Sequence, residues 1–239
     1  MMAVILAGGK GTRLKPFTMN IPKPLLPLGD TPILEVVLQQ LAASGFKRVV
    51  ITLGHMANLF AVTIGNGERW NMQIEYCREE EPLGTAGPLR CISDLDDNFL
   101  VMNGDLLTTI NYKKLFDIHC TQGAWGTIAL HRREVHIDYG VVRTNEDGRL
   151  QEYIEKPSIP YTVSMGINVL SRQCIDFIPG EGKYDMPQLM MAMHQSGKPV
   201  VCHETDCYWQ DIGRFDDYQQ ASADFDKAPE RFMPQSKEA

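Results

Sequence analysis

The apolar run Met2-Ala-Val-Ile-Leu-Ala7 passes directly into Gly8-Gly-Lys-Gly-Thr-Arg13 at the start of the chain. A continuous apolar run of this length is typical of a strand that is buried on both faces. The glycines that follow allow a tight turn whose backbone N–H groups can approach phosphate oxygens closely. The stretch therefore predicts a buried parallel strand followed by a candidate phosphate-binding loop, although composition alone gives an ordinary strand-to-loop turn about even odds.

The glycine-rich stretch matches neither of two common phosphate-binding motifs. A P-loop requires a Gly-Lys pair followed by Ser or Thr, and no such triplet occurs in the sequence. A dinucleotide fingerprint that begins at Gly9 would need a third glycine at position 14, where Leu14 stands. Both a P-loop kinase and a classical dinucleotide-dependent oxidoreductase are therefore disfavoured.

Further short apolar or alternating runs along the chain are typical of strands. They lie at 48–53, 73–77, 98–102, 127–131, 139–143, 150–154 and 164–170. A helix is expected to begin at Thr31-Pro32, an N-cap followed by proline at the first helical position, and to end before Gly45. Other helices are expected at 55–64, 85–95, 185–195 and 214–225. The alternation predicts an α/β fold with a Rossmann-like open mixed, mainly parallel sheet flanked by helices.

The domain organisation follows from a change of pattern near the middle of the chain. We expect a single domain over residues 1–226, with a first half of about 1–110 and a second half of about 111–226. The short strands of the second half predict a mixed-sheet lid over the first. Residues 227–239 are polar and predict a loose tail.

Composition narrows the classes of partner. The net charge of −7 argues against nucleic acid and against an anionic membrane, because both require a basic face. No apolar stretch approaches the roughly 20 residues that would span a bilayer. Six scattered cysteines without a CxxC pair, and no signal peptide at the start, predict reduced thiols and a cytoplasmic protein. A homo-oligomer stays open as an alternative to a monomer.

Two basic residues are candidates for holding phosphate. Arg13 can bind a phosphate with two parallel hydrogen bonds. Lys23 lies between Pro22 and Pro24, which restrict the backbone and hold the lysine in one direction. Taken alone, however, a lysine in a proline-rich loop is more often a solvated surface residue, by about two to one.

Together these motifs resemble the signature of the sugar-1-phosphate nucleotidylyltransferase family, also called nucleotide-sugar pyrophosphorylases. The resemblance rests on Gly8-Gly-Lys-Gly-Thr-Arg13 followed by Pro22-Lys-Pro-Leu25, and it extends from residue 2 to about 225. It implies an enzyme that joins an NTP to a sugar 1-phosphate and releases pyrophosphate. The first half of the chain would then bind the nucleotide, and the second half would bind the sugar phosphate.

The resemblance also implies a role for individual residues. Catalytic roles fall on Arg13, Lys23 and Lys156. Nucleotide-binding roles fall on Leu6, Ala7, Gly8, Gly9, Gly11, Thr12, Gly84, Thr85, Gly87 and Gly104. Sugar-binding roles fall on Gly140, Glu155, Gly166 and Asn168. Asp105 and Asp211 would hold Mg²⁺, which prefers oxygen ligands from one or two carboxylates together with substrate phosphates.

The identity of the substrates stays open at this point. Leu83-Gly-Thr-Ala-Gly87 is most similar to the mannose-1-phosphate guanylyltransferase branch and its heptose-phosphate relatives, which favours GTP with a mannose- or heptose-type 1-phosphate. UTP-, dTTP- or CTP-dependent enzymes are the first alternative. A non-catalytic sugar-nucleotide-binding regulatory subunit is the second, although such subunits lose the charged residues that this chain keeps.

Overall fold

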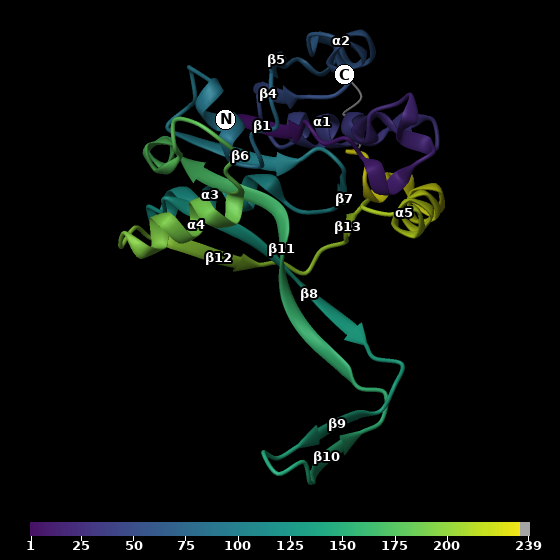
Figure 1. The fold of residues 1–239 in the computed structure, drawn as a ribbon. Helices are drawn as coiled ribbons and strands as arrows, with labels where there is room; N and C mark the ends of the chain where they lie inside the picture. The colour runs from purple at the N-terminus through teal and green to yellow at the C-terminus, as the bar shows by residue number, and fades with distance from the viewer. Residues whose placement is uncertain (235–239) are drawn as a thin grey trace.

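The apolar run at the start of the chain forms strand β1 (Met2–Ala7), an inner strand of a seven-stranded sheet with the order β12-β8-β11-β6-β1-β4-β5. The structure is a computed structural model, and it describes residues 1–234. The other strands of this sheet are β4 (Arg48–Leu53), β5 (Gln73–Arg78), β6 (Asn98–Asn103), β8 (Gly126–His136), β11 (Ser158–Ser171) and β12 (Val200–Glu204). Only β11 runs opposite to the rest, so the predicted mixed, mainly parallel sheet is confirmed (Figure 1).

Helices cover both faces of the sheet, as expected for an open α/β fold. They are α1 (Ile33–Ala43), α2 (Ala57–Ile64), α3 (Tyr112–Gln122), α4 (Met186–Gln195) and α5 (Phe215–Lys227). Alternate residues of β1 point to opposite faces: Ala3 and Ile5 pack with α1, α2 and α3, whereas Met2 and Val4 pack with α4. A separate apolar cluster joins α5 to the loops that follow β1. Both faces of the sheet are therefore buried, which explains the continuous apolar runs of its strands.

Three local predictions are wrong in instructive ways. The expected helix at 85–95 is a short 3₁₀ helix at Gly87–Cys91, because a Gly-Pro start leaves few residues that favour a helix. Thr31–Pro32 forms a strand, β3, that pairs with β2 (Pro27–Leu28), so α1 begins only at Ile33.

The third difference concerns the tail after α5, which was expected to be loose. Phe232 is buried among the side chains that α5 covers, and its carbonyl accepts a hydrogen bond of 2.7 Å from Gln40 Nε2. Phe232, with Met233 packed beside it, therefore anchors the described part of this segment to the body. Residues 235–239 of the predicted tail lie outside the described residues.

A small antiparallel pair positions the loop after β6. Strand β7 (Leu106–Thr108) pairs with β13 (Trp209–Asp211), and in this register Asp211 lies opposite Leu106. The amide of Ile212 also donates to the carbonyl oxygen of Asp105. The pair therefore places Asp211 beside Asp105 at the carboxyl edge of the sheet, where open α/β folds bind ligands.

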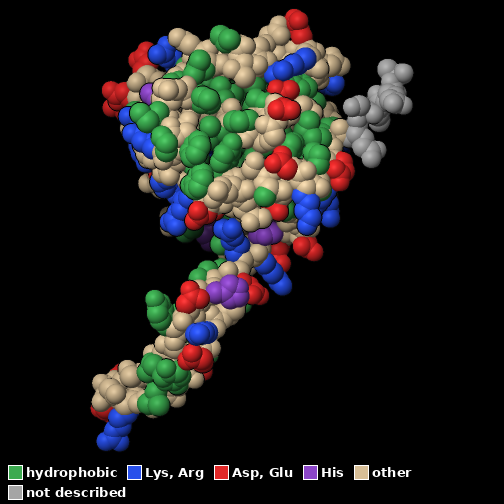
Figure 2. Space-filling model, turned by 90° about the vertical axis from the view of Figure 1, so that its right-hand side faces the viewer, with side chains coloured by type: hydrophobic (Ala, Val, Ile, Leu, Met, Phe, Trp, Pro, Cys, Tyr) green, Lys and Arg blue, Asp and Glu red, His purple; other side chains and the backbone are tan. Residues whose placement is uncertain are grey.

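Residues 131–163 leave the body as an arm. Beyond Leu130 and Ser164, β8 and β11 continue as a two-stranded ribbon that pairs with no other strand of the described chain. The hairpin of β9 (Val141–Thr144) and β10 (Leu150–Ile154) forms the far end of the arm (Figure 1). None of the residues in the arm is buried, and in the space-filling view it is a narrow extension of the body (Figure 2).

The buried histidine His119 links α3 to the sheet. Its Nδ1 lies 2.9 Å from Thr127 Oγ1, and its Nε2 lies 3.0 Å from Asn98 Oδ1. Both contacts suit the neutral imidazole, which can accept from the threonine hydroxyl and donate to the amide oxygen. Burial lowers the pKa of His119 from 6.5 to about 4.

We therefore expect His119 to make stability depend on pH in acid. Because its folded pKa is depressed, the unfolded chain binds a proton first as the pH falls. The stability that the neutral His119 contributes is fully present above pH 6.5 and is lost as the pH falls towards about 4. Between pH 7.5 and pH 4.5, the free energy of unfolding should fall by on the order of 2 kcal/mol less in a His119→Gln variant than in wild type. Urea unfolding at the two pH values measures this difference. Equal losses in the two proteins would show that His119 does not titrate in this way.

Candidate active site

A buried lysine lies between two carboxylates at the carboxyl edge of the sheet. Lys23 begins a 3₁₀ turn at Lys23–Leu25 and is only 9% exposed, so the alternative of a solvated surface lysine is wrong. Its ammonium forms an ion pair with the Asp105 carboxylate and lies 3.8 Å from Asp211 Oδ1. The structure thus brings together three predicted site residues from distant parts of the sequence.

The cluster formed by Lys23, Asp105 and Asp211 carries more negative than positive charge. Burial raises the pKa of Asp211, and the nearby charge of Asp105 raises it further, whereas Lys23 and Arg13 lower it. Within residues 1–234 no group of three or more His, Cys, Asp or Glu side chains converges in a way that could hold a metal. Asp105 and Asp211 supply two neighbouring carboxylates, and a divalent cation held by them would take its remaining oxygen ligands from substrate phosphates.

The glycine-rich loop lines a cavity of about 210 Å³ next to this cluster. Thr18 Oγ1 donates a 2.7 Å hydrogen bond to the carbonyl oxygen of Gly11, which fixes the loop. Gly11 has φ +59°, a left-handed conformation that favours glycine. The lining of the cavity consists of Leu6, Ala7, Gly9, Gly11, Thr12, Arg13, Lys23, Pro24, Asp105 and Gly213. Most of the predicted phosphate-binding residues therefore face one space.

A second cavity, of about 340 Å³, continues from the first along the sheet edge. It is lined by Leu6, Gly8, Gly9, Thr52, Glu79, Pro82, Gly84, Thr85, Asn103, Asp105, Lys183 and Asp185. The amide of Thr85 donates to Asp185 Oδ1 over 3.0 Å, which ties the 83–87 loop to the start of α4. Gly87 does not line the cavity; its amide donates to the carbonyl oxygen of Tyr184 and so supports the same loop.

Glu79 is a residue of this cavity that the sequence did not reveal. It follows the last residue of β5, and its Oε2 accepts a 3.1 Å hydrogen bond from the amide of Leu83. Burial raises its pKa. A Cβ on Gly8 would lie 2.6 Å from Glu79 Oε1, so the Glu79 carboxylate closely approaches the backbone of the glycine-rich loop. The signal in the sequence was only its position at a strand end, within the run Glu79-Glu-Glu81.

A third cavity, of about 440 Å³, lies on the other side of Leu6. It contains the predicted sugar-binding residues Gly166 and Asn168, together with Asn103 and Asp211. Its remaining wall is largely apolar and comes from β11, α4 and Trp209. The side chains of that wall include Met165, Met186, Pro187, Met190 and Met191.

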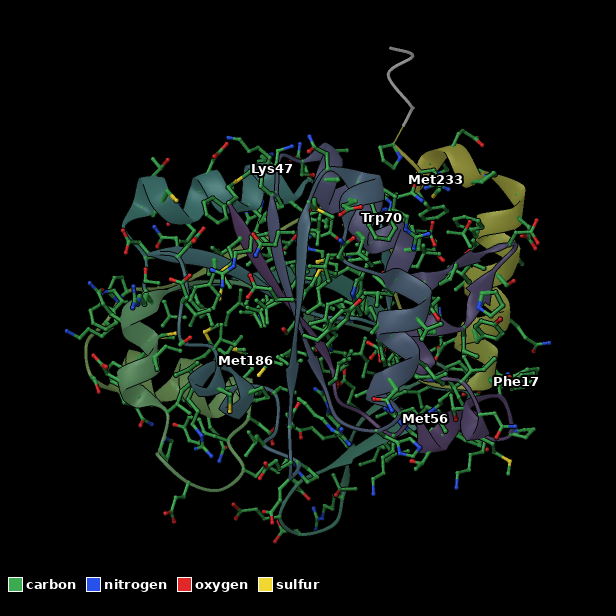
Figure 3. The ribbon with its side chains drawn as sticks, turned by 90° about the horizontal axis from the view of Figure 1, so that it is seen from above. Phe17, Lys47, Met56, Trp70, Met186 and Met233 are labelled. Carbon is green, nitrogen blue, oxygen red and sulfur yellow. The ribbon has the colours of Figure 1, made fainter. Side chains whose placement is uncertain are left out.

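The three cavities meet at the Lys23–Asp105–Asp211 cluster. Leu6 lines all three, Asp105 lines the first two, and Asp211 lines the third. Viewed from above, Met186 and Phe17 lie on opposite sides of the central strands (Figure 3). Met186 belongs to the third cavity, and Phe17 follows the glycine-rich loop. Ligands bound in adjoining cavities would approach each other at the cluster.

Other predicted site residues lie outside these cavities. Gly104 packs behind the site, where its amide donates to the carbonyl oxygen of Leu6. Gly140 lies in the arm, where a Cβ on it would meet the Tyr153 ring. Glu155 and Lys156 are exposed in the arm beside β10. The continuous pairing of β8 with β11 carries these three arm residues away from the body, so their roles stay predictions.

Two further observations concern the structure outside the candidate site. A larger cavity, of about 670 Å³, opens near Asn98 and Ser171 at the opposite edge of the sheet and contains none of the predicted site residues. Among residues 1–234, every helix is too short or too polar to cross a membrane.

Comparison with known proteins gives relatives over nearly the whole chain. A UTP–glucose-1-phosphate uridylyltransferase from Synechocystis sp. is 34% identical over 92% of this chain and 62% of its own length. A mannose-1-phosphate guanylyltransferase from Mycobacterium tuberculosis is also 34% identical, over 93% of this chain and 64% of its own length. The chain therefore spans less than two thirds of the length of these relatives.

Solved structures show the same fold. HddC from Yersinia pseudotuberculosis superimposes with a TM-score of 0.72 at 26% identity, covering 94% of this chain and 99% of that one. A complex of HddC with GMP-PN gives a TM-score of 0.70. Residues 2–228 also match the family model described as Nucleotidyl transferase. With these matches and the geometry of the site, the chain belongs to the nucleotidyl transferase family.

Proposed function

We propose that the chain transfers a nucleotidyl group from an NTP to a sugar 1-phosphate, giving an NDP-sugar and pyrophosphate. The observation that carries this proposal is the Lys23–Asp105–Asp211 cluster at the meeting point of three cavities. Both 34%-identical relatives are named as enzymes of this type. Retention of Arg13 and Lys23 at the site counts against a non-catalytic regulatory subunit. A cytoplasmic location stays a prediction from the cysteine pattern.

In this proposal the glycine-rich loop holds the triphosphate. Backbone N–H groups near Gly9 and Gly11 would donate to phosphate oxygens, and Arg13 would bind them with two parallel hydrogen bonds. Lys23 lines the same cavity and would neutralise charge on the departing pyrophosphate. These residues supply positive charge where the reaction develops negative charge.

The nucleophile is an oxygen of the sugar phosphate, which enters from the third cavity. It forms a bond to the α-phosphorus while the bond from that phosphorus to the β-phosphate oxygen breaks, so pyrophosphate leaves with the electron pair. No general base is required, because the attacking oxygen is already an anion. The protein must hold two anions in line against their repulsion, which is how phosphoryl transfer is generally catalysed.

Magnesium is part of the proposal. The donor set fits it, because two adjacent carboxylates share a single lysine and leave room for phosphate oxygens as further ligands. Bound there, Mg²⁺ would supply positive charge to the phosphate oxygens. Lys23 and Arg13 would still be required, because the triphosphate and the sugar phosphate together carry more negative charge than one divalent ion neutralises.

We further propose GTP as the nucleotide, with a mannose- or heptose-type 1-phosphate. Glu79 supports this choice, because an ionised carboxylate accepts hydrogen bonds only, and guanine offers both N1–H and the N2 amino group as donors. Uracil and thymine offer one donor flanked by two carbonyl acceptors, which a carboxylate would repel. The Yersinia complex with GMP-PN is consistent with GTP, whereas the Synechocystis relative is named for UTP.

The reaction can be tested by measuring pyrophosphate release from each NTP with a panel of sugar 1-phosphates and magnesium. We expect release with wild type, and turnover lower by about tenfold to a thousandfold in Asp105→Asn, because one of the two carboxylates that would hold magnesium at the phosphates is lost. Asp117→Asn is the matched control, since Asp117 pairs with Lys113 on the surface of α3. Wild-type turnover in Asp105→Asn at saturating magnesium would refute the assigned role.

The preference for guanine over other nucleotide bases can be tested separately with a Glu79→Gln variant. The amide of glutamine keeps one acceptor but adds a donor, so we expect kcat/KM for GTP to fall by roughly 10- to 100-fold, with a smaller change for UTP. Glu80→Gln is the control, because Glu80 is the exposed neighbour of Glu79. An unchanged ratio of GTP to UTP efficiency in Glu79→Gln would show that this carboxylate does not select the base.

A further inference from the structure

The arm of residues 131–163 carries an apolar surface that the rest of the described chain leaves uncovered. Large hydrophobic side chains are exposed along it: Val135, Tyr139, Val142, Leu150, Tyr153 and Tyr161. Tyr139 is 78% exposed, and green side chains mark the far end of the arm (Figure 2). A two-stranded ribbon without a core is marginal in water, and the apolar side chains exposed along it are available for contact with another molecule.

The third cavity, in turn, lacks a positive charge. Its lining contains carboxylate, amide, hydroxyl and apolar groups but neither Lys nor Arg. Lys23 at its border is already paired with Asp105. Arg133 approaches only from outside, with its guanidinium carbon 5.3 Å from the centre of the Trp209 ring. A sugar 1-phosphate is a dianion, and a magnesium ion on Asp105 and Asp211 would be shared with the triphosphate, so a cation of the protein at this cavity would help to hold the sugar phosphate.

The missing groups are present in the arm, at Glu155 and Lys156. A carboxylate accepts hydrogen bonds from sugar hydroxyls, and an ammonium group pairs with phosphate. Both side chains are exposed. The arm therefore carries the cation that the cavity lacks, but holds it away from the body.

The arm cannot deliver these groups to its own cavity in this conformation. β11 runs without interruption from Ser158 to Ser164 at the cavity rim, which at ~3.3 Å per residue is about 20 Å. That distance is several times the length of a lysine side chain, and Lys156 precedes Ser158. Folding the arm back would require a bend at its base, where the register of β8 with β11 shifts between Ser164 and Asn168.

We propose that the arms of two copies of this chain cross, so that Glu155 and Lys156 of each copy complete the sugar-phosphate cavity of the other. This inference rests on the proposed function. The exposed tyrosines and aliphatic residues of the arm would pack against the apolar α4 wall of the other copy, which includes the exposed Met191. Both complementary surfaces lie on one chain, so a single two-fold arrangement satisfies each of them twice.

A mixed-dimer experiment tests the proposal directly. Lys156→Ala and Asp105→Asn are co-expressed with different affinity tags, and the mixed species is isolated by two purification steps. Each variant alone should turn over at least about tenfold slower than wild type. The mixed dimer should recover about half of the wild-type rate per dimer, because the Lys156→Ala copy keeps Asp105 and receives Lys156 from the other copy. A mixed dimer as slow as either variant would overturn the proposal.

The oligomeric state provides a second readout that does not depend on activity. Wild type should be a dimer by light scattering. A variant in which Asn-Gly replaces residues 137–157, between the paired residues His136 and Ser158, should be a monomer with an unchanged circular dichroism spectrum. A monomeric wild type, or a dimer that survives this deletion, would overturn the proposal.

The two readouts separate the failure of this inference from failure of the proposed function. Pyrophosphate release by a monomeric wild type would leave the function standing and remove the crossed arms. A dimer that depends on the arm but releases no pyrophosphate with any NTP and sugar phosphate would support the crossed arms and remove the function.

Discussion

The structure depends on one electrostatic arrangement, in which the Lys23 ammonium lies between the carboxylates of Asp105 and Asp211. Burying the Lys23 ammonium without a carboxylate partner would be costly, and Asp105 and Asp211 supply that negative charge where the two strand ends meet. The β7–β13 pair and the glycine-rich loop both border this cluster. The same arrangement leaves net negative charge and open space, which suits a metal ion and two phosphorylated ligands.

The sheet could be predicted from the sequence because its strands are buried on both faces and read as continuous apolar runs. Contacts between residues that lie far apart in the sequence could not be predicted in this way. Nothing near Asp211 in the sequence shows that β13 lies beside β7, and nothing near Lys23 shows that it is buried. Glu79 was missed because three consecutive glutamates have no internal pattern, and only the fold shows which one faces a cavity.

The position of the arm, which carries two of the predicted sugar-binding residues, likewise could not be predicted from the sequence. Alternating residues indicate that 127–131 and 164–170 form strands, but not that β8 and β11 continue together beyond the sheet. The family resemblance assigns Gly166, Asn168, Glu155 and Lys156 to one pocket. The structure brings the first two to a cavity and keeps the last two in an exposed ribbon. The proposed second copy of the chain would reconcile the two observations.

Binding of a nucleoside triphosphate with magnesium tests the central claim most directly, because the claim requires the charged cluster to hold that ligand in the native state. Thermal unfolding of the wild-type protein is measured with each NTP, with and without Mg²⁺. A ligand at about 100 times its Kd stabilises the native state by about 2.7 kcal/mol, enough to raise Tm by several degrees. We predict the largest increase with GTP and magnesium together. No increase with any NTP would contradict the account.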